Sequence, residues 1–234
     1  MSRVSLRLLV ALITFTLGIV ATAVWLTRKV PELQAPAVTK SQCFPGKADK
    51  IDAVRVVADR YFPDGVFYKD EKRDRFVSGW YSRNLRMMNE APLLTSHHDH
   101  DRSYRFLWLR SFHPSVVVRL WANGEKYMLS VKELSLRDQN KPNQLLTDQT
   151  RILSNDEWAG FVKQLDETCF WEIPTTTNDP IAMDGARWVL EGIQQGYYHI
   201  ATRQSPDSGS YRELCLYMLK LSALPLDPSK GEIY

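Results

Sequence analysis

The chain has 234 residues, of which 44% are hydrophobic and 24% are charged. These fractions are those of ordinary globular proteins, so they exclude a chain that is disordered along most of its length. The formal net charge of +3 comes without a stripe of lysine, arginine and aromatic residues, so we expect no nucleic-acid binding.

Residues 1–29 predict an N-terminal membrane anchor. The run from Leu8 to Leu26 contains no charged residue and has the length that a helix needs to cross a hydrocarbon layer of roughly 30 Å. Basic residues flank it on both sides, as is common beside transmembrane helices: Arg3, Arg7, Arg28 and Lys29. The positive amino terminus favours placing the short leading side in the cytoplasm.

A cleaved signal peptide is the alternative, because Ala21, Thr22 and Ala23 match a small-residue cleavage site. The apolar run continues past this site to Leu26, which favours an uncleaved anchor. The anchored domain is then extracytoplasmic, whereas cleavage would leave it secreted or periplasmic.

Residues 30–47 contain three prolines and no hydrophobic period, so we predict a linker followed by a folded domain over residues 48–234. Apolar residues at helical spacing from Ile51 to Tyr61 favour a helix, although the valines there also suit a strand. The pattern from Phe76 to Met88 predicts a better helix, which Pro92 helps to end.

The middle of the chain changes to an alternating period typical of β-strands. One strand is expected around residues 104–108, and a hairpin joins residues 116–121 to residues 127–131. Asn123 and Gly124 accept the positive φ angles of a type I′ turn, which would connect the two strands.

The clearest helix begins after Ser154, which forms a capping box with Glu157, and Leu153 can pack on Trp158. Its apolar residues lie on one face up to Leu165.

A second hairpin over residues 186–203 and a helix over residues 210–221 complete the domain. Strands grouped between helices, without strand–helix alternation, predict an α+β fold. We therefore expect a transmembrane helix and one soluble domain, with an antiparallel sheet and three or four packed helices.

The second hairpin carries a candidate site. A three-residue loop at Gln194 to Gly196 would place Ile193 opposite Tyr197 and Glu191 opposite His199. The apolar face would then hold Trp188, Leu190, Tyr198 and Ile200. A neighbouring carboxylate favours the charged imidazole, so we expect a raised pKa for His199. The pair is either structural or a catalytic dyad, and a two-residue turn would instead set Glu191 opposite Tyr198.

A second candidate is the stretch His97, His98, Asp99, His100 and Asp101. Imidazole and carboxylate groups could hold zinc or nickel. Adjacent residues cannot all converge on one ion, so we expect an exposed loop that binds no metal tightly.

Cys43, Cys169 and Cys215 are too few for a disulfide-stapled miniprotein. Free buried thiols are expected, with one disulfide among the three cysteines as the alternative.

The chain lacks the dinucleotide-binding, phosphate-binding, zinc-protease, nucleophile-elbow and CxxC motifs. Two functions remain. One is a non-catalytic binding or envelope-associated domain without a cofactor, which contacts the lipid bilayer through Leu8–Leu26 and binds an envelope protein partner. The other is a hydrolase or metal-dependent enzyme that uses His97, His98 or His100, or Glu191 with His199.

Three segments resemble a family of uncharacterised bacterial exported or membrane-anchored proteins. They are WYSRNLRMMNEAPLL, SYRFLWLRSFHPSVVVRL, and DGARWVLEGIQQGYYHIATRQSP followed by RELCLYMLKLS. The resemblance covers most of the soluble domain and implies a bacterial source and an envelope location. It implies no activity, cofactor or catalytic residue.

Overall fold

A computed structural model describes residues 43–51, 60–96, 102–136, 142–177, 184–226 and 233–234. The described residues belong to one compact unit, Ser41–Tyr234. The predicted membrane segment Leu8–Leu26 lies outside them, as do residues 52–59 of the helix expected between Ile51 and Tyr61. In the part of the chain that is described, no helix is both long and apolar enough to span a bilayer.

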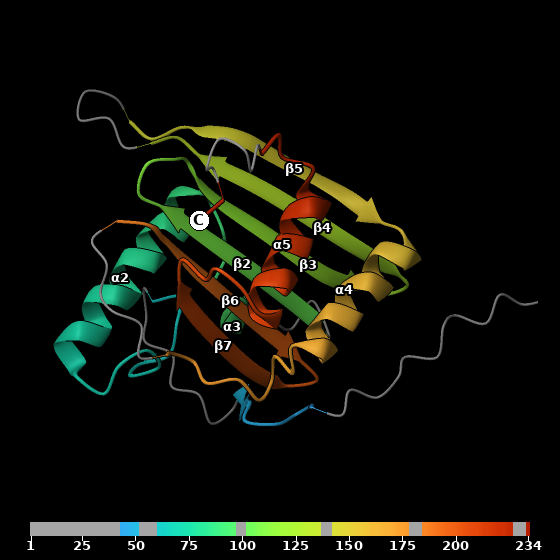
Figure 1. The fold of residues 1–234 in the computed structure, drawn as a ribbon, viewed down its shortest axis with the longest axis horizontal. Coiled ribbons are helices and arrows are strands. Elements are labelled where there is room, and N and C mark those ends of the chain that lie inside the picture. Colours follow the sequence, from blue (N-terminus) through green and yellow to red (C-terminus); the bar gives the residue numbers. More distant parts are fainter. Residues whose placement is uncertain (1–42, 52–59, 97–101, 137–141, 178–183, 227–232) are drawn as a thin grey trace, which may run out of the picture. The chain divides into compact units, whose positions relative to one another are not determined.

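The centre of the domain is a seven-stranded sheet in which all neighbouring strands are antiparallel (Figure 1). Its strands are β1 (Asp49–Lys50), β2 (Arg102–Arg110), β3 (Ser115–Asn123), β4 (Lys126–Leu134), β5 (Leu145–Leu153), β6 (Ala186–Gln194) and β7 (Tyr197–Gln204). With its four described helices, the domain confirms the predicted α+β class.

The strand order β1-β7-β6-β2-β3-β4-β5 departs from the sequence order at two places, where β1 lies beside β7 and where β6 lies beside β2. Strands β2 to β5 form a meander, after which helix α4 (Asn155–Glu167) leads the chain back across the sheet. Strand β6 then pairs with β2, and β7 pairs with β6. Residues that are distant in sequence thus become neighbours along β2 and β6.

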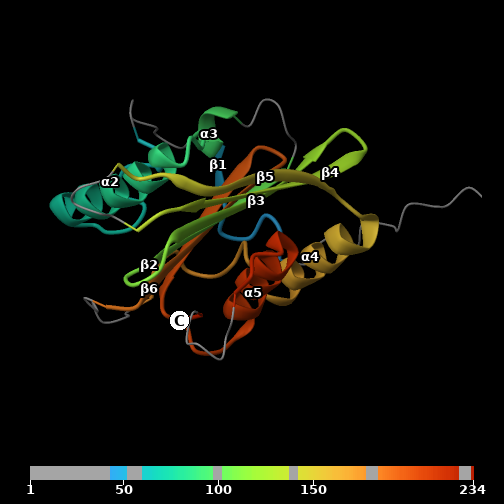
Figure 2. The same cartoon turned by 90° about the horizontal axis from the view of Figure 1, so that it is seen from above.

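Helices cover both faces of the sheet, as Figure 2 shows: α4 and α5 (Ser210–Ser222) pack on one face, and α2 (Glu71–Met87) and α3 (Leu93–Ser96) on the other. Strand β2 therefore buries both of its faces. Tyr104, Phe106 and Trp108 belong to the core under α4 and α5, whereas Leu107 and Leu109 belong to the core under α2 and α3. We call these two halves of the domain the α4/α5 side and the α2 side.

The start of α4 is as the sequence predicted. The Ser154 hydroxyl accepts a hydrogen bond from the Glu157 backbone N–H at 3.1 Å, and the Glu157 carboxylate accepts one from the Ser154 N–H at 2.8 Å. Leu153 and Trp158 are buried in the same core. This capping box satisfies two backbone donors that the first turn leaves without partners.

Helix α2 is also confirmed, but its buried stripe includes polar residues that the apolar pattern did not predict: Asp74, Ser78 and Ser82. The buried Asp74 carboxylate accepts hydrogen bonds from the backbone N–H groups of Gly65, Phe67 and Tyr68. Asp74 therefore fixes the loop that precedes the helix.

The hairpin between β3 and β4 is confirmed, but its turn is displaced by one residue. Asn123 pairs with Lys126, so the loop consists of Gly124 and Glu125. Gly124 has φ +59° at the first central position, as in a type II′ turn. The glycine is needed as predicted, but Asn123 continues the strand.

Two expectations about the N-terminal part of the domain need correction. Cys43 and Cys169 form a disulfide with a Cα–Cα distance of 5.2 Å, so only Cys215 is a free buried thiol. Phe44 packs between Trp171 and Tyr197, and the Lys47 N–H donates to the Trp171 carbonyl. The folded domain thus begins before Ala48.

Candidate functional site

The second hairpin has a different register from the expected one. Gln194 pairs with Tyr197, which leaves a two-residue turn in which Gln195 and Gly196 both have positive φ. Glu191 is therefore opposite Ile200, and not opposite His199 or Tyr198. A shift of one residue exchanges the two faces of a strand, so Glu191 and His199 lie on opposite faces of the sheet.

The same shift corrects the predicted apolar face. Trp188 and Leu190 belong to the α4/α5 side, whereas Tyr198 and Ile200 belong to the α2 side. All four are buried, but they do not share one face.

His199 is buried against the rings of Phe170 and Trp171 on the α4/α5 side. Its Nε2 lies 2.9 Å from the Ile173 carbonyl oxygen, which can only accept, so Nε2 carries the proton. Burial lowers the pKa of His199 to about 4. The predicted rise in pKa is therefore wrong, because desolvation dominates and no carboxylate of β6 is opposite the ring.

Glu191 lies on the α2 side in a buried charged cluster. Its Oε1 accepts hydrogen bonds from Arg105 Nε at 2.8 Å and Nη2 at 2.5 Å, and its Oε2 accepts one from the Tyr198 hydroxyl at 3.1 Å. Burial raises the pKa of Glu191, and the contacts with Arg105 oppose that rise by favouring the carboxylate.

Glu90 extends this cluster across the sheet. Its carboxylate forms ion pairs with Arg105 at 3.6 Å, Arg119 at 3.8 Å and Lys132 at 2.9 Å, and its carbonyl accepts from Tyr61 at 2.6 Å. These groups come from β2, β3, β4 and the segment between α2 and α3. Because the carboxyl groups and Arg105 are buried, the cluster fixes that segment to the sheet and offers no open site.

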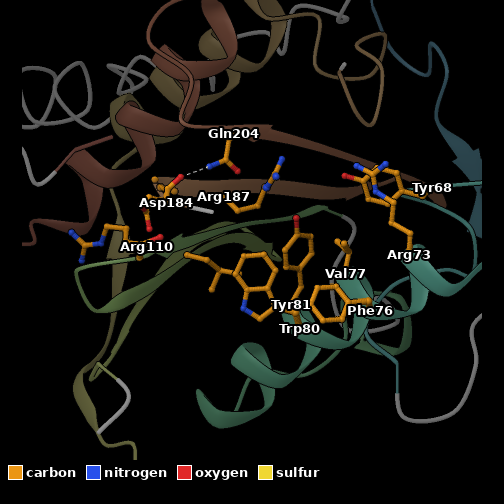
Figure 3. Close-up of a pocket in the computed structure, with 14 residues that line it drawn as sticks. Tyr68, Arg73, Phe76, Val77, Trp80, Tyr81, Arg110, Asp184, Arg187 and Gln204 are labelled. Atoms are coloured by element: carbon orange, nitrogen blue, oxygen red, sulfur yellow. Dashed lines mark hydrogen bonds between the residues drawn. The ribbon is translucent and has the colours of Figure 1, made fainter. Parts of the chain in front are cut away.

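An open site lies beside α2, at the ends of β2 and β6 (Figure 3). Two hollows of about 490 and 500 Å³ share the lining residues Trp80, Leu109, Arg110 and Ser111, so they adjoin, and we call the two together the groove. Each volume is in the range of sites for small organic molecules. We call the 490 Å³ part the first hollow and the other part the second hollow.

The walls of the first hollow differ in chemistry. Helix α2 supplies Phe76, Trp80 and Tyr81, and the strands supply Arg110 and Arg187. Phe76 is 75% exposed and Trp80 is 41% exposed, although both are large aromatic side chains. In Figure 3, Tyr81 points from α2 toward the strand that carries Arg187.

Arginines outnumber carboxylates along this groove. Arg73, Arg110 and Arg187 line the first hollow with a single carboxylate, Asp184. Arg83 and Arg110 line the second hollow, which has no carboxylate among its described lining residues. The charged side chains that line the groove are therefore mainly arginines, of which Arg110 also forms an ion pair with Glu133 at 3.7 Å.

Glu191 and His199 do not line this groove. His97, His98 and His100 lie outside the described residues, so their predicted exposed loop is not described. The described residues contain no group of three histidine, cysteine, aspartate or glutamate side chains that could hold a metal ion. The missed signal was the spacing of Phe76 and Trp80, which lie four residues apart and outside the buried stripe of α2.

Comparisons with protein-family models, with curated proteins and with solved structures found no match.

Proposed function

We propose that this protein is a membrane-anchored binding protein whose α+β domain lies outside the cytoplasm and binds an envelope partner through the groove. Leu8–Leu26 forms the transmembrane anchor in this proposal, and cleavage at the small residues Ala21 to Ala23 would instead release the same domain into the periplasm or medium.

The groove carries the binding part of the proposal. Exposing aromatic side chains such as Phe76 and Trp80 costs free energy that a purely structural surface would avoid. Aromatic residues and arginine are the side chains that contribute most to binding energy at recognition sites. Both kinds meet in this groove.

The disulfide supports the location outside the cytoplasm. Structural disulfides persist in oxidising compartments, whereas cytosolic thiols are kept reduced. The bond between Cys43 and Cys169 joins the segment before β1 to the end of α4, so it belongs to the folded structure.

Photo-crosslinking in native membranes tests the binding role. p-Benzoylphenylalanine in place of Phe76 should give a light-dependent adduct, because this side chain projects from the groove wall. The matched control is the same residue in place of Ile152, which is 59% exposed on edge strand β5. Equal adducts at both positions, or none at Phe76, would contradict a binding role for the groove.

Thiol labelling of intact cells tests the location. Ser208→Cys places a thiol on an exposed loop before α5, and the native free thiol Cys215 is buried. A membrane-impermeant maleimide should label this variant without permeabilisation. Labelling that requires lysis would contradict the proposed topology.

The enzyme alternative no longer has a candidate catalytic dyad, because Glu191 and His199 lie on opposite faces of the sheet. A metal-dependent activity at His97, His98 or His100 stays a prediction. Zinc titration of the protein and of a variant with alanine at these three positions would test it.

A further inference from the structure

Arg187, which lines the first hollow, carries a side-chain N–H without a hydrogen-bond partner among the described residues. The Arg187 Nε is buried and has no hydrogen-bond partner in the described part of the chain. A buried donor without a partner costs free energy, and in a native protein it often marks a place where a ligand or water binds. Arg187 lines the first hollow, so a ligand there can reach its guanidinium.

The other arginines of this hollow are already in use. Arg110 donates to the Pro114 carbonyl at 2.9 and 2.6 Å and lies 4.2 Å from the centre of the Trp108 ring. The Arg73 guanidinium lies 3.8 Å from the centre of the Tyr68 ring. They contribute positive charge, but Arg187 is the arginine with an unused buried donor in this hollow.

Negative charge around Arg187 is scarce. Asp184 is exposed, and its described contact is through its backbone carbonyl, which accepts from Gln204 at 3.1 Å. Tyr81 stays neutral near Arg187, because burial raises the pKa of its hydroxyl to about 12. An anion placed at Arg187 would thus meet net positive charge.

The opposite wall suits an apolar body. Phe76, Val77 and Trp80 present side chains from α2, and the lining of the hollow is mainly apolar. Flat apolar groups stack on such rings. A peptide that adds a strand finds no edge here, because β6 is already paired with β2 and β7.

We propose that the first hollow binds a small organic anion, with a carboxylate or phosphate group at Arg187 and an apolar body on Trp80 and Phe76. The proposal rests on the proposed binding function and goes beyond it, because it assigns a small ligand to the first hollow. Charge and apolar surface on opposite walls give the ligand one orientation. Arg73, Arg110 and Arg187 in the lining disfavour a cationic ligand, and Asp184 is the one lining carboxylate that would favour it.

Fluorine NMR on the full chain in phosphatidylcholine nanodiscs tests this proposal. The protein carries 5-fluorotryptophan, and Trp80→Phe assigns the Trp80 resonance. Three probes share one body: 2-naphthylacetate, 2-naphthyl phosphate and the neutral 2-naphthylacetamide. At least one anion should shift the Trp80 resonance saturably, with an affinity about tenfold or more above that of the amide.

The arginine variants locate the charge recognition. Arg187→Gln should weaken anion binding about tenfold or more and change the affinity for the amide by less than about twofold. Arg187→Lys should restore part of the loss, because it keeps the charge without the planar fork. The matched control is Arg75→Gln, an exposed arginine of α2 outside the hollow, which should bind the anions as the wild type does.

Equal affinities for the anions and the amide, or equal losses in Arg187→Gln and Arg75→Gln, would overturn the proposal. So would saturable binding of an acidic, phenylalanine-containing peptide without binding of either naphthyl anion. Those results leave the proposed function standing if Phe76 still crosslinks specifically. Absence of both crosslinking and ligand binding removes the proposed function as well.

Discussion

The cores on the two sides of the sheet contain different kinds of side chains. On the α4/α5 side, aromatic and aliphatic side chains form a continuous core, and the helices begin and end close to where the sequence predicts. On the α2 side, the core shares its space with Asp74, Glu90, Arg105 and Glu191, all of them buried.

Most of the buried polar atoms without a hydrogen-bond partner also lie on the α2 side. Ser78 Oγ, Ser130 Oγ and Arg187 Nε lie on the α2 side, whereas the α4/α5 side has Trp171 Nε1 among the described residues. Departures from the ordinary rules of packing tend to gather where a protein functions. The comparison therefore assigns recognition to the α2 side and expects each side to be stabilised by different interactions, and four changes test it.

The largest loss of folding stability is expected at Arg105. Arg105→Met leaves Glu191 buried without its main partner and removes one ion pair of Glu90, so the free energy of unfolding should fall by about 3–5 kcal/mol. Urea unfolding measures this loss. The double variant Arg105→Met, Glu191→Leu should be more stable than the single one, because it also removes a buried charge. A single variant within about 1 kcal/mol of wild type would show that this cluster does not hold the α2 side together.

The α4/α5 side should respond to acid through His199. Its pKa is about 4 in the folded protein and 6.5 when unperturbed, so the unfolded chain binds the proton more strongly. The stabilisation is complete above pH 6.5 and is lost as the pH falls toward 4, by about 2–3 kcal/mol.

The variant His199→Gln separates this effect from the titration of carboxylates. Stability of both proteins should be measured between pH 7 and about pH 4. The wild type should lose about 2–3 kcal/mol more than the variant over this range. Parallel pH profiles would show that His199 keeps an ordinary pKa.

A smaller effect is expected at the start of α4. Ser154→Ala removes the hydroxyl that accepts from the Glu157 N–H, and the free energy of unfolding should fall by about 1 kcal/mol. Ser208→Ala, in an exposed loop, is the control and should have little effect. An equal effect of both changes would mean that the cap contributes nothing.

The smallest effect on stability is expected at Phe76, the most exposed large apolar side chain of α2. Phe76→Gln should change the free energy of unfolding by less than about 0.5 kcal/mol, because the ring is 75% exposed. The same variant should weaken binding of the naphthyl anions. A loss of stability of about 2 kcal/mol or more would show instead that Phe76 is part of the core.

The sequence predicted the helices and strands better than it predicted how the strands pair. Ser154 and Glu157 define the start of α4 through local hydrogen bonds, so three residues of sequence suffice. The predicted register of the hairpin between β6 and β7 was wrong because Gln195 adopts φ +49°, a conformation that glycine and asparagine adopt more readily. Its local pattern therefore gave no sign of a two-residue turn.

The groove could not be predicted, because it depends on a long-range pairing. Trp80 and Arg187 are brought together when β6 returns across the sheet to pair with β2, and no local pattern specifies that return. Strand β5 was missed for a different reason. It is an edge strand with mostly exposed residues, so it lacks the alternation that marks a half-buried strand.

The bond between Cys43 and Cys169 also determines how the domain would bear a mechanical load. A pull applied to the chain before Cys43 passes through the sulfur atoms directly to Cys169, 126 residues further along. The intervening segment, which contains β2 to β5 and α4, cannot be drawn out while the bond is intact. The bond thus withholds roughly 400 Å of extensible chain. Under oxidising conditions a tether at the N-terminal end can transmit force only to β6, β7 and α5, whereas a reductant would expose the whole sheet to stretching.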